Sequence, residues 1–374
     1  MSSIPPGTDL CAIPGAQPPP GVTPNLVDPD SLQGATVAVT TVLITWATLF
    51  VAARVYANFR QLGLADYFVV ISLILSGGYN GTVLAILEYT RHQWDIPACW
   101  FNARYMKILY AQGVLLSPVI FFGKSSIFLL YQQIFTLEKP MKLAIRFGLV
   151  FTFIMYWPHV GLESYFCAPH VGEAWDELLT NGRPAKMIYW GIVQGTLAVL
   201  LDLYIFILPL PRLWMLQRPL WKRLQIMAVF STAMLGVVAS VMALVYRIRL
   251  RTTSDTTYTQ SQLFICVNVE NNIAIIVSSM PAVSKFVRRN VLESAFVKSL
   301  HSKLSSSSGG YSSDAVPRLE RSGSRKRPKT HDSVLEGAEG EYYELGDLQR
   351  QRKDSRGTSS PGLEEVEGRY YAAV

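Results

Sequence analysis

Long stretches without charged side chains dominate this sequence. Three of them contain no Asp, Glu, Lys or Arg: residues 36–53, 67–87 and 224–246. Three more contain a single charged residue each: residues 108–137 with Lys124, 187–211 with Asp202, and 256–284 with Glu270. A helix needs about 20 mostly apolar residues to cross about 30 Å of hydrocarbon. The runs therefore predict a membrane protein that crosses the bilayer several times.

A seventh span follows from a shorter run, residues 147–162, because another uncharged stretch after Glu163 extends it to about Phe166. The runs are continuous, whereas the strands of a membrane barrel show segments of about ten residues with alternating hydrophobicity. We therefore expect an all-α bundle of seven transmembrane helices. Their expected positions are residues 36–57, 66–88, 108–134, 144–166, 187–211, 223–247 and 261–284.

The overall composition supports a membrane protein and argues against a soluble enzyme. Half of the residues are hydrophobic and only 16% are charged, against about 25% in a typical soluble domain. The formal net charge of +7 then bears on orientation in the membrane and on contact with anionic lipid. The lipid bilayer is the predicted partner, and no nucleic acid is expected.

The charges that flank the helices predict the orientation. Residues 1–35 contain three Asp and no Lys or Arg, and they show no signal-peptide pattern, whereas Arg54 and Arg60 follow the first apolar run. By the positive-inside rule the N-terminus lies outside and the C-terminus inside. Three arginines between the last two helices, Arg247, Arg249 and Arg251, are a contrary signal. The plasma membrane is the expected location.

Three regions are expected along the chain: an outer segment over residues 1–35, the seven-helix domain over residues 36–290, and a cytosolic tail over residues 291–374. The tail is Ser-rich and charged, with few apolar residues to bury, so we expect it to be disordered. Its basic cluster at residues 325–329 could be a nuclear signal, but contact with anionic lipid fits a seven-helix protein better. Three serines in basic sequence are candidate phosphorylation sites: Ser322, Ser324 and Ser355.

The cysteines predict a disulfide on the outer side. Cys99 lies between the second and third helices and Cys167 at the end of the fourth, so both fall on the outer side in this orientation. We expect Cys99 and Cys167 to pair. Cys11 also lies outside and could compete for either partner, because sequence alone does not decide connectivity. No Cys and His spacing indicates a metal site.

Three charged residues lie deep inside the predicted helices. A charge at mid-membrane costs at least about 2.5–3.5 kcal/mol, so such a residue indicates a functional site. Measured from the inner helix ends, Lys124, Asp202 and Glu270 lie at heights of roughly 17, 14 and 21 Å. They share one slab of the bilayer, and Asn271 adds a polar group beside Glu270. Either they form a polar clamp between helices, or they form a ligand, ion or proton site.

The usual chemistry of light sensing does not fit this sequence. In opsins the retinal chromophore is bound to a lysine in the middle of the seventh helix. Here the last span contains no lysine before Lys285 at the membrane edge, and Lys124 lies on the third helix. We therefore expect no retinal and no other cofactor.

Six segments in order resemble the fungal rhodopsin-like-domain integral membrane proteins, the group with the Pth-type receptors and the satratoxin-cluster membrane proteins. The segments are RVY at 54–56 with LADY at 64–67, HQWD at 92–95, KSSI at 124–127, CAP at 167–169, Asp202 with LPLP at 208–211, and EN at 270–271 with Pro281. The resemblance covers roughly residues 36–290. The chain departs from the family pattern at Ala65, Gln133 and Met280. The resemblance implies a seven-helix membrane protein without implying one ligand or reaction.

Three functions are open at this point. The resemblance favours a receptor-like sensor of an unknown small molecule, with a cytosolic signalling partner at the inner loops 58–65 and 212–222 and at the tail. A small-molecule transporter or exporter is the first alternative, although no internal repeat is visible. A membrane-embedded enzyme of a biosynthetic pathway is the second. No catalytic residue is predicted, because no nucleophile, base and orienting group occur in a recognisable pattern.

Overall fold

The fold is a bundle of long helices. The structure, a computed structural model, describes residues 9–134, 139–211 and 220–287, with the side chains of the last range described from residue 229 onward. The helices are α1 (Gln33–Asn58), α2 (Leu64–Ala85), α3 (Ala103–Ile134), α4 (Lys139–Cys167), α5 (Met187–Ile207), α7 (Leu220–Arg249) and α8 (Thr256–Val287). The three serines predicted as phosphorylation sites lie outside the described residues.

Seven of the described helices are long and apolar enough to cross a membrane, which confirms the predicted all-α fold. Some of them begin earlier than expected. α3 begins at Ala103, and α4 and α8 each begin five residues before the predicted starts of 144 and 261. Hydropathy marks the part of a helix that lies in hydrocarbon, whereas its backbone hydrogen bonds continue into the polar turns beyond.

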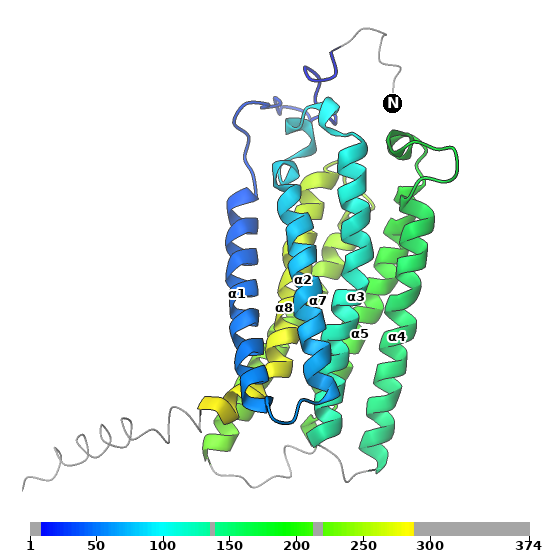
Figure 1. The fold of residues 1–374 in the computed structure, drawn as a ribbon. Coiled ribbons are helices and arrows are strands. Elements are labelled where there is room, and N and C mark those ends of the chain that lie inside the picture. Colours follow the sequence, from blue (N-terminus) through cyan, green and yellow to red (C-terminus); the bar gives the residue numbers. More distant parts are fainter. Residues whose placement is uncertain (1–8, 135–138, 212–219, 288–374) are drawn as a thin grey trace, which may run out of the picture. The chain divides into compact units, whose positions relative to one another are not determined.

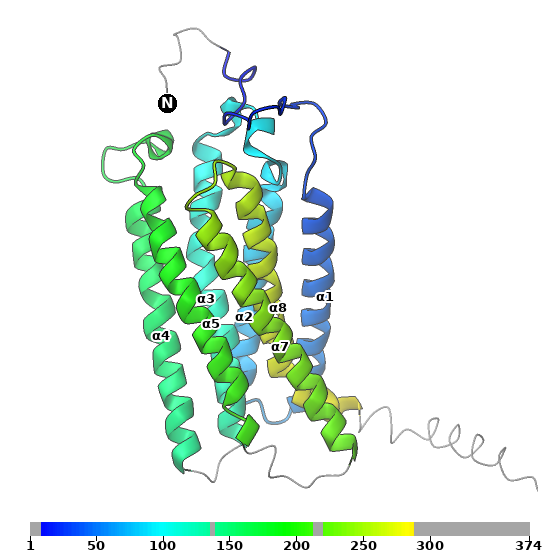
Figure 2. The same cartoon turned by 180° about the vertical axis from the view of Figure 1, so that it is seen from behind.

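The helices run alternately up and down, so that residues 9–32 and the end of α8 lie at opposite ends of the bundle (Figures 1 and 2). α8 packs against α1, α2, α3 and α7, while α3 also packs against α2 and α4. The outer faces carry exposed large apolar side chains, among them Trp46, Leu49, Ile74, Phe147, Ile154 and Leu235. Such a surface is stable against lipid and unfavourable against water. Which end faces outside stays a prediction.

The N-terminal segment lies across the connection between α2 and α3. The amide of Gly15 donates to the carbonyl of Ile96 at 2.7 Å, and the amide of Ala98 donates to the carbonyl of Ile13 at 2.9 Å. The amide of Asn25 donates to Asp95 Oδ1 at 2.8 Å. These bonds attach the segment to the end of the bundle where the α2–α3 connection lies.

The predicted pairing of Cys99 with Cys167 is wrong. Cys99 forms a disulfide with Cys11, with their Cα atoms 5.0 Å apart. The two cysteines meet because backbone hydrogen bonds align the N-terminal segment with the α2–α3 connection at this point. The amide of Cys99 itself donates to the carbonyl of Leu10. Cys167 is a free thiol at the end of α4, in contact with the carboxyl group of Glu163.

Candidate functional site

The three charged residues of the bundle interior meet, as expected from their heights. Lys124 on α3 places its Nζ 2.7 Å from Asp202 Oδ1 on α5 and 2.7 Å from Glu270 Oε1 on α8. Lys124 is 1% exposed and Glu270 6%. We call these residues the charged triad. One cation between two carboxylates offsets much of the cost of burying them.

The triad holds three helices together. It also touches α4, because Lys124 Nζ lies 5.9 Å from the centre of the Tyr156 ring, within the range of a cation–π contact. With both carboxylates ionised, the triad carries one excess negative charge. This charge makes the site responsive to a proton, a cation or a neighbouring positive group.

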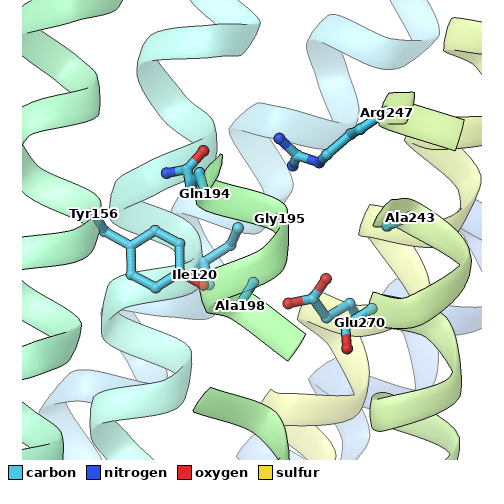
Figure 3. A pocket seen from close by; sticks show the side chains of 9 residues that line it. Ile120, Tyr156, Gln194, Gly195, Ala198, Ala243, Arg247 and Glu270 are labelled. Atoms are coloured by element: carbon cyan, nitrogen blue, oxygen red, sulfur yellow. The ribbon is translucent and has the colours of Figure 1, made fainter. Parts of the chain in front are cut away.

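A pocket opens beside the triad, between α3, α4, α5, α7 and α8. Its lining residues are Ile120, Tyr156, Gln194, Gly195, Ala198, Ser240, Ala243, Arg247 and Glu270. Figure 3 shows Arg247 and Gln194 on one side of this pocket and Glu270 on the other. Its enclosed volume is about 10 Å³, room for about one water molecule, and the empty space reaches about 270 Å³ only when the part that is open to the surroundings is included. Glu270 belongs both to the lining of the pocket and to the charged triad.

Arg247 lies along the face of α5 that contains two glycines. Its Nη1 donates to the carbonyl of Gly191 at 3.1 Å. A Cβ atom at Gly195 would lie 2.9 Å from Arg247 Cδ, so a larger residue there would displace the arginine. Two small residues one turn apart thus make room for a long side chain between α5 and α7.

Sequence reasoning missed Arg247, which it treated only as a contrary loop charge. The residue belongs to the apolar span that runs from Val229 to Arg249, and it turns into the bundle. Two signals could have identified it: an arginine at the end of an uncharged run, and a Gly-x-x-x-Gly pattern at residues 191–195 on another span. Gln194 and Tyr156 were missed as well, since neither carries a charge.

Asn271, a predicted site residue, is buried but does not line this pocket. Its neighbours have packing roles instead. Asn268 Nδ2 donates to Thr40 Oγ1 on α1 at 3.0 Å, and Asn272 Nδ2 donates to Asn268 Oδ1 at 2.6 Å. Within the described ranges, no group of three or more His, Cys, Asp or Glu side chains could hold a metal ion.

The fold and the site define a class: integral membrane proteins with seven helices and a charged core. Within this class, the chain belongs to the family described as the fungal rhodopsin domain, which matches residues 49–289. The family resemblance of the six sequence segments is thereby confirmed.

Two curated proteins are similar to this chain. A SAT4 family membrane protein of Emericella nidulans is 30% identical over 187 residues, which is 50% of this chain and 47% of that protein. The fugralins biosynthesis cluster protein 2 of Gibberella zeae is 20% identical over 325 residues, which is 83% of this chain and 79% of that protein. The chain thus spans about half the length of the first relative. No solved structure matches this chain.

Proposed function

We propose that this protein is a receptor-like sensor that binds a small molecule in the pocket beside the charged triad. One observation carries the proposal: Glu270 is both a wall of the pocket and a partner of Lys124. A ligand that contacts Glu270 competes with the ion pair that joins α3 and α8. Binding therefore favours one arrangement of these helices over another, which is what a ligand must do to shift a conformational equilibrium.

α8 connects the pocket to the far end of the bundle. It runs from Thr256 to Val287 and carries Glu270 near its middle. Towards its end, the carbonyl of Ser278 accepts a hydrogen bond from Arg54 on α1. A displacement of α8 at Glu270 is therefore expected to reach the end where α8 leaves the membrane. We propose that this end faces the cytosol, where the inner loops meet a signalling partner, and that the protein resides in the plasma membrane.

The first experiment tests binding. The purified full chain is incubated with a metabolite extract, and the retained small molecules are identified by mass spectrometry. The variant Glu270→Gln keeps the shape of the side chain and removes its charge. We expect it to lose a compound that the unaltered protein retains. Lys107→Met serves as the matched control, because Lys107 is an exposed lysine on α3.

The second experiment tests the sensor itself. The compound found in this way is added to the protein in lipid nanodiscs, and hydrogen exchange is measured at residues 275–287. A sensor changes its exchange at this distant end of α8 on binding, and Lys124→Met reduces that change. Identical exchange with and without the bound compound would reject the sensor.

Small-molecule transport is the second candidate, and it is favoured by the excess negative charge of the triad, which could carry a coupling proton. Its test uses sealed vesicles that contain the purified protein. A transporter moves the retained compound across the membrane faster in the presence of a pH gradient, and Asp202→Asn removes this dependence. If the protein is a sensor, the compound crosses the membrane no faster than it crosses the membrane of protein-free vesicles.

A further inference from the structure

Glu163 on α4 is a buried carboxyl group that lies apart from the charged triad. It precedes the end of the helix at Cys167 by four residues, and it is 8% exposed. In the sequence it stands out only as the charge that interrupts the fourth apolar run. It does not line the pocket beside the triad, so its burial needs an explanation of its own.

The carboxyl group of Glu163 packs against the backbone of α3. A Cβ atom at Gly113 would collide with the carboxyl carbon and with Oε1 of Glu163, so only a glycine leaves room for this group. Beside it, the hydroxyl of Tyr110 on α3 lies 3.2 Å from Ser164 Oγ on α4. The contact between the two helices therefore encloses the carboxyl group and shields most of it from solvent.

His159, one turn earlier on α4, does not act as a counter-ion for Glu163. Its Nε2 lies 3.8 Å from Glu163 Oε2, which is beyond hydrogen-bond distance. Its Nδ1 accepts a hydrogen bond from Trp190 Nε1 on α5 at 3.0 Å. The N–H group of an indole can only donate, so this Nδ1 carries no proton and the imidazole is neutral.

No other cation of the described residues compensates a charge on Glu163. Arg183 of the loop after α4 is held by Glu173, with 2.7 Å between Nη2 and Oε2. Arg247 on α7 lines the pocket instead. Across the described ranges, no lysine or arginine nitrogen lies within 4.0 Å of the Glu163 carboxyl group. The thiol of Cys167 donates to this group, but S–H is a weak donor.

An ionised carboxylate without a counter-ion or strong donors is costly to bury, whereas a neutral acid is not. We propose that Glu163 is a proton-binding site, a neutral carboxylic acid that holds its proton between α3 and α4. The neutral acid packs against Gly113 without an unpaired charge, whereas the ionised form requires water or a cation to enter between the helices. Close packing of α3 on α4 at this end of the bundle therefore depends on one bound proton (Figure 1).

Infrared spectroscopy of the purified full chain tests this proposal, because a protonated carboxyl group has a C=O stretching band in a region where carboxylates and amides do not absorb. The protein is measured in a detergent without ester or carboxyl groups, at about pH 6, where an ordinary Glu with a pKa of about 4.3 is ionised. We expect the band to lose the intensity of one group in Glu163→Gln. An identical band in the unaltered chain and in Glu163→Gln would overturn the proposal.

Glu177→Gln is the matched control, because Glu177 is an exposed glutamate in the loop after α4. It should leave the carboxylic acid band unchanged. Loss of the same intensity in Glu177→Gln would assign the band to a group other than Glu163 and would count against the proposal.

Thermal unfolding at the same pH gives an independent measurement. Glutamine has nearly the size and shape of a neutral glutamic acid, so Glu163→Gln should unfold at nearly the temperature of the unaltered chain. Glu163→Ala leaves a cavity beside Gly113 and should unfold at a lower temperature. A large change in Glu163→Gln, in either direction, would show that the unaltered chain carries a charge at this position. Neither measurement bears on the sensor, since Glu163 lies outside the lining of the pocket.

Discussion

Arg54 on α1 and Asp66 on α2 form a buried ion pair, with 2.6 Å between Arg54 Nε and Asp66 Oδ1. The same guanidinium donates to the carbonyl of Ser278 on α8. Asp66 in turn accepts hydrogen bonds from Asn58 Nδ2 at 3.0 Å and from the amide of Gly63 at 2.8 Å. One arginine thus joins three helices at the end of the bundle opposite the N-terminal segment (Figure 1).

Removing one partner of the Arg54–Asp66 pair is expected to destabilise the protein more than removing both partners. Asp66→Asn leaves a buried guanidinium without its counter-ion, which costs about 3–5 kcal/mol. The double variant Arg54→Met/Asp66→Leu buries no charge at these two positions, so it should lose less stability than Asp66→Asn alone. Thermal unfolding in detergent measures the difference. Arg60→Met removes an exposed arginine near the end of α1 and should change little. A double variant as unstable as the single one would contradict this interpretation.

The Cys11–Cys99 disulfide is expected to hold the N-terminal segment on the bundle. Its sequence separation is 88 residues, and the loss of a disulfide that closes a long loop costs about 2–4 kcal/mol. Cys11→Ser and Cys99→Ser should lower the unfolding temperature to the same extent, and the double variant should lower it no further. Cys266→Ser is the control, since Cys266 is a free thiol. Peptide mapping without reduction should recover the Cys11–Cys99 link, and a Cys99–Cys167 peptide would show that the bridge is elsewhere.

Gly148 is expected to set the distance between α3 and α4. A Cβ atom at this position would lie 2.4 Å from the ring of Phe128, whereas a Cβ at Gly161 on the same helix would meet nothing within 4 Å. Overpacking a well-packed core costs about 1–3 kcal/mol, so Gly148→Ala should destabilise the protein. Gly161→Ala should be neutral or stabilising, because alanine favours the helix. Thermal unfolding of the two variants side by side is the measurement, and equal unfolding temperatures would be inconsistent with tight packing at Gly148.

The loop between α4 and α5 is expected to loosen in acid. The amide of His170, together with the guanidinium of Arg183, holds the pKa of Glu173 below its ordinary value of 4.5. Because the folded loop stabilises the ionised form, its contribution is complete above about pH 4.5 and is lost as the pH falls through the lower folded value. Limited pepsin digestion at residues 168–183 should therefore increase with acidity, relative to Glu173→Gln at each pH.

The Glu173→Gln variant lacks the ionised group, so its loop should be digested more readily than the unaltered loop at the upper end of the pH range and equally at the lower end. Asp176→Asn is the control, because Asp176 is an exposed carboxylate of the same loop. It should keep the pH dependence of the unaltered chain. A constant ratio between the unaltered chain and Glu173→Gln at every pH would argue against a role for Glu173.

The seven helices and the depth of the charged triad could be predicted from the sequence. In hydrocarbon each backbone N–H and C=O must find its partner within the segment, so an apolar run of sufficient length has to be a helix. The position of a residue along that helix then determines its depth in the membrane. Lys124, Asp202 and Glu270 share one depth, and a buried charge gains so much from an opposite charge that their meeting could be anticipated.

Only the tertiary structure decided the disulfide and the pocket. Cys11, Cys99 and Cys167 lie beyond the apolar runs, where no membrane restricts the path of the chain, so their pairing depends on where the N-terminal segment crosses the bundle. Arg247 was unforeseen for a different reason. Hydropathy locates a helix along the sequence but says nothing about its rotation around its own axis, and that rotation decides whether an arginine near its end faces outward or lies between α5 and α7. The rotation of the helix is set by packing against neighbours that are distant in sequence. Here the absence of a side chain at Gly195 on α5 leaves room for Arg247.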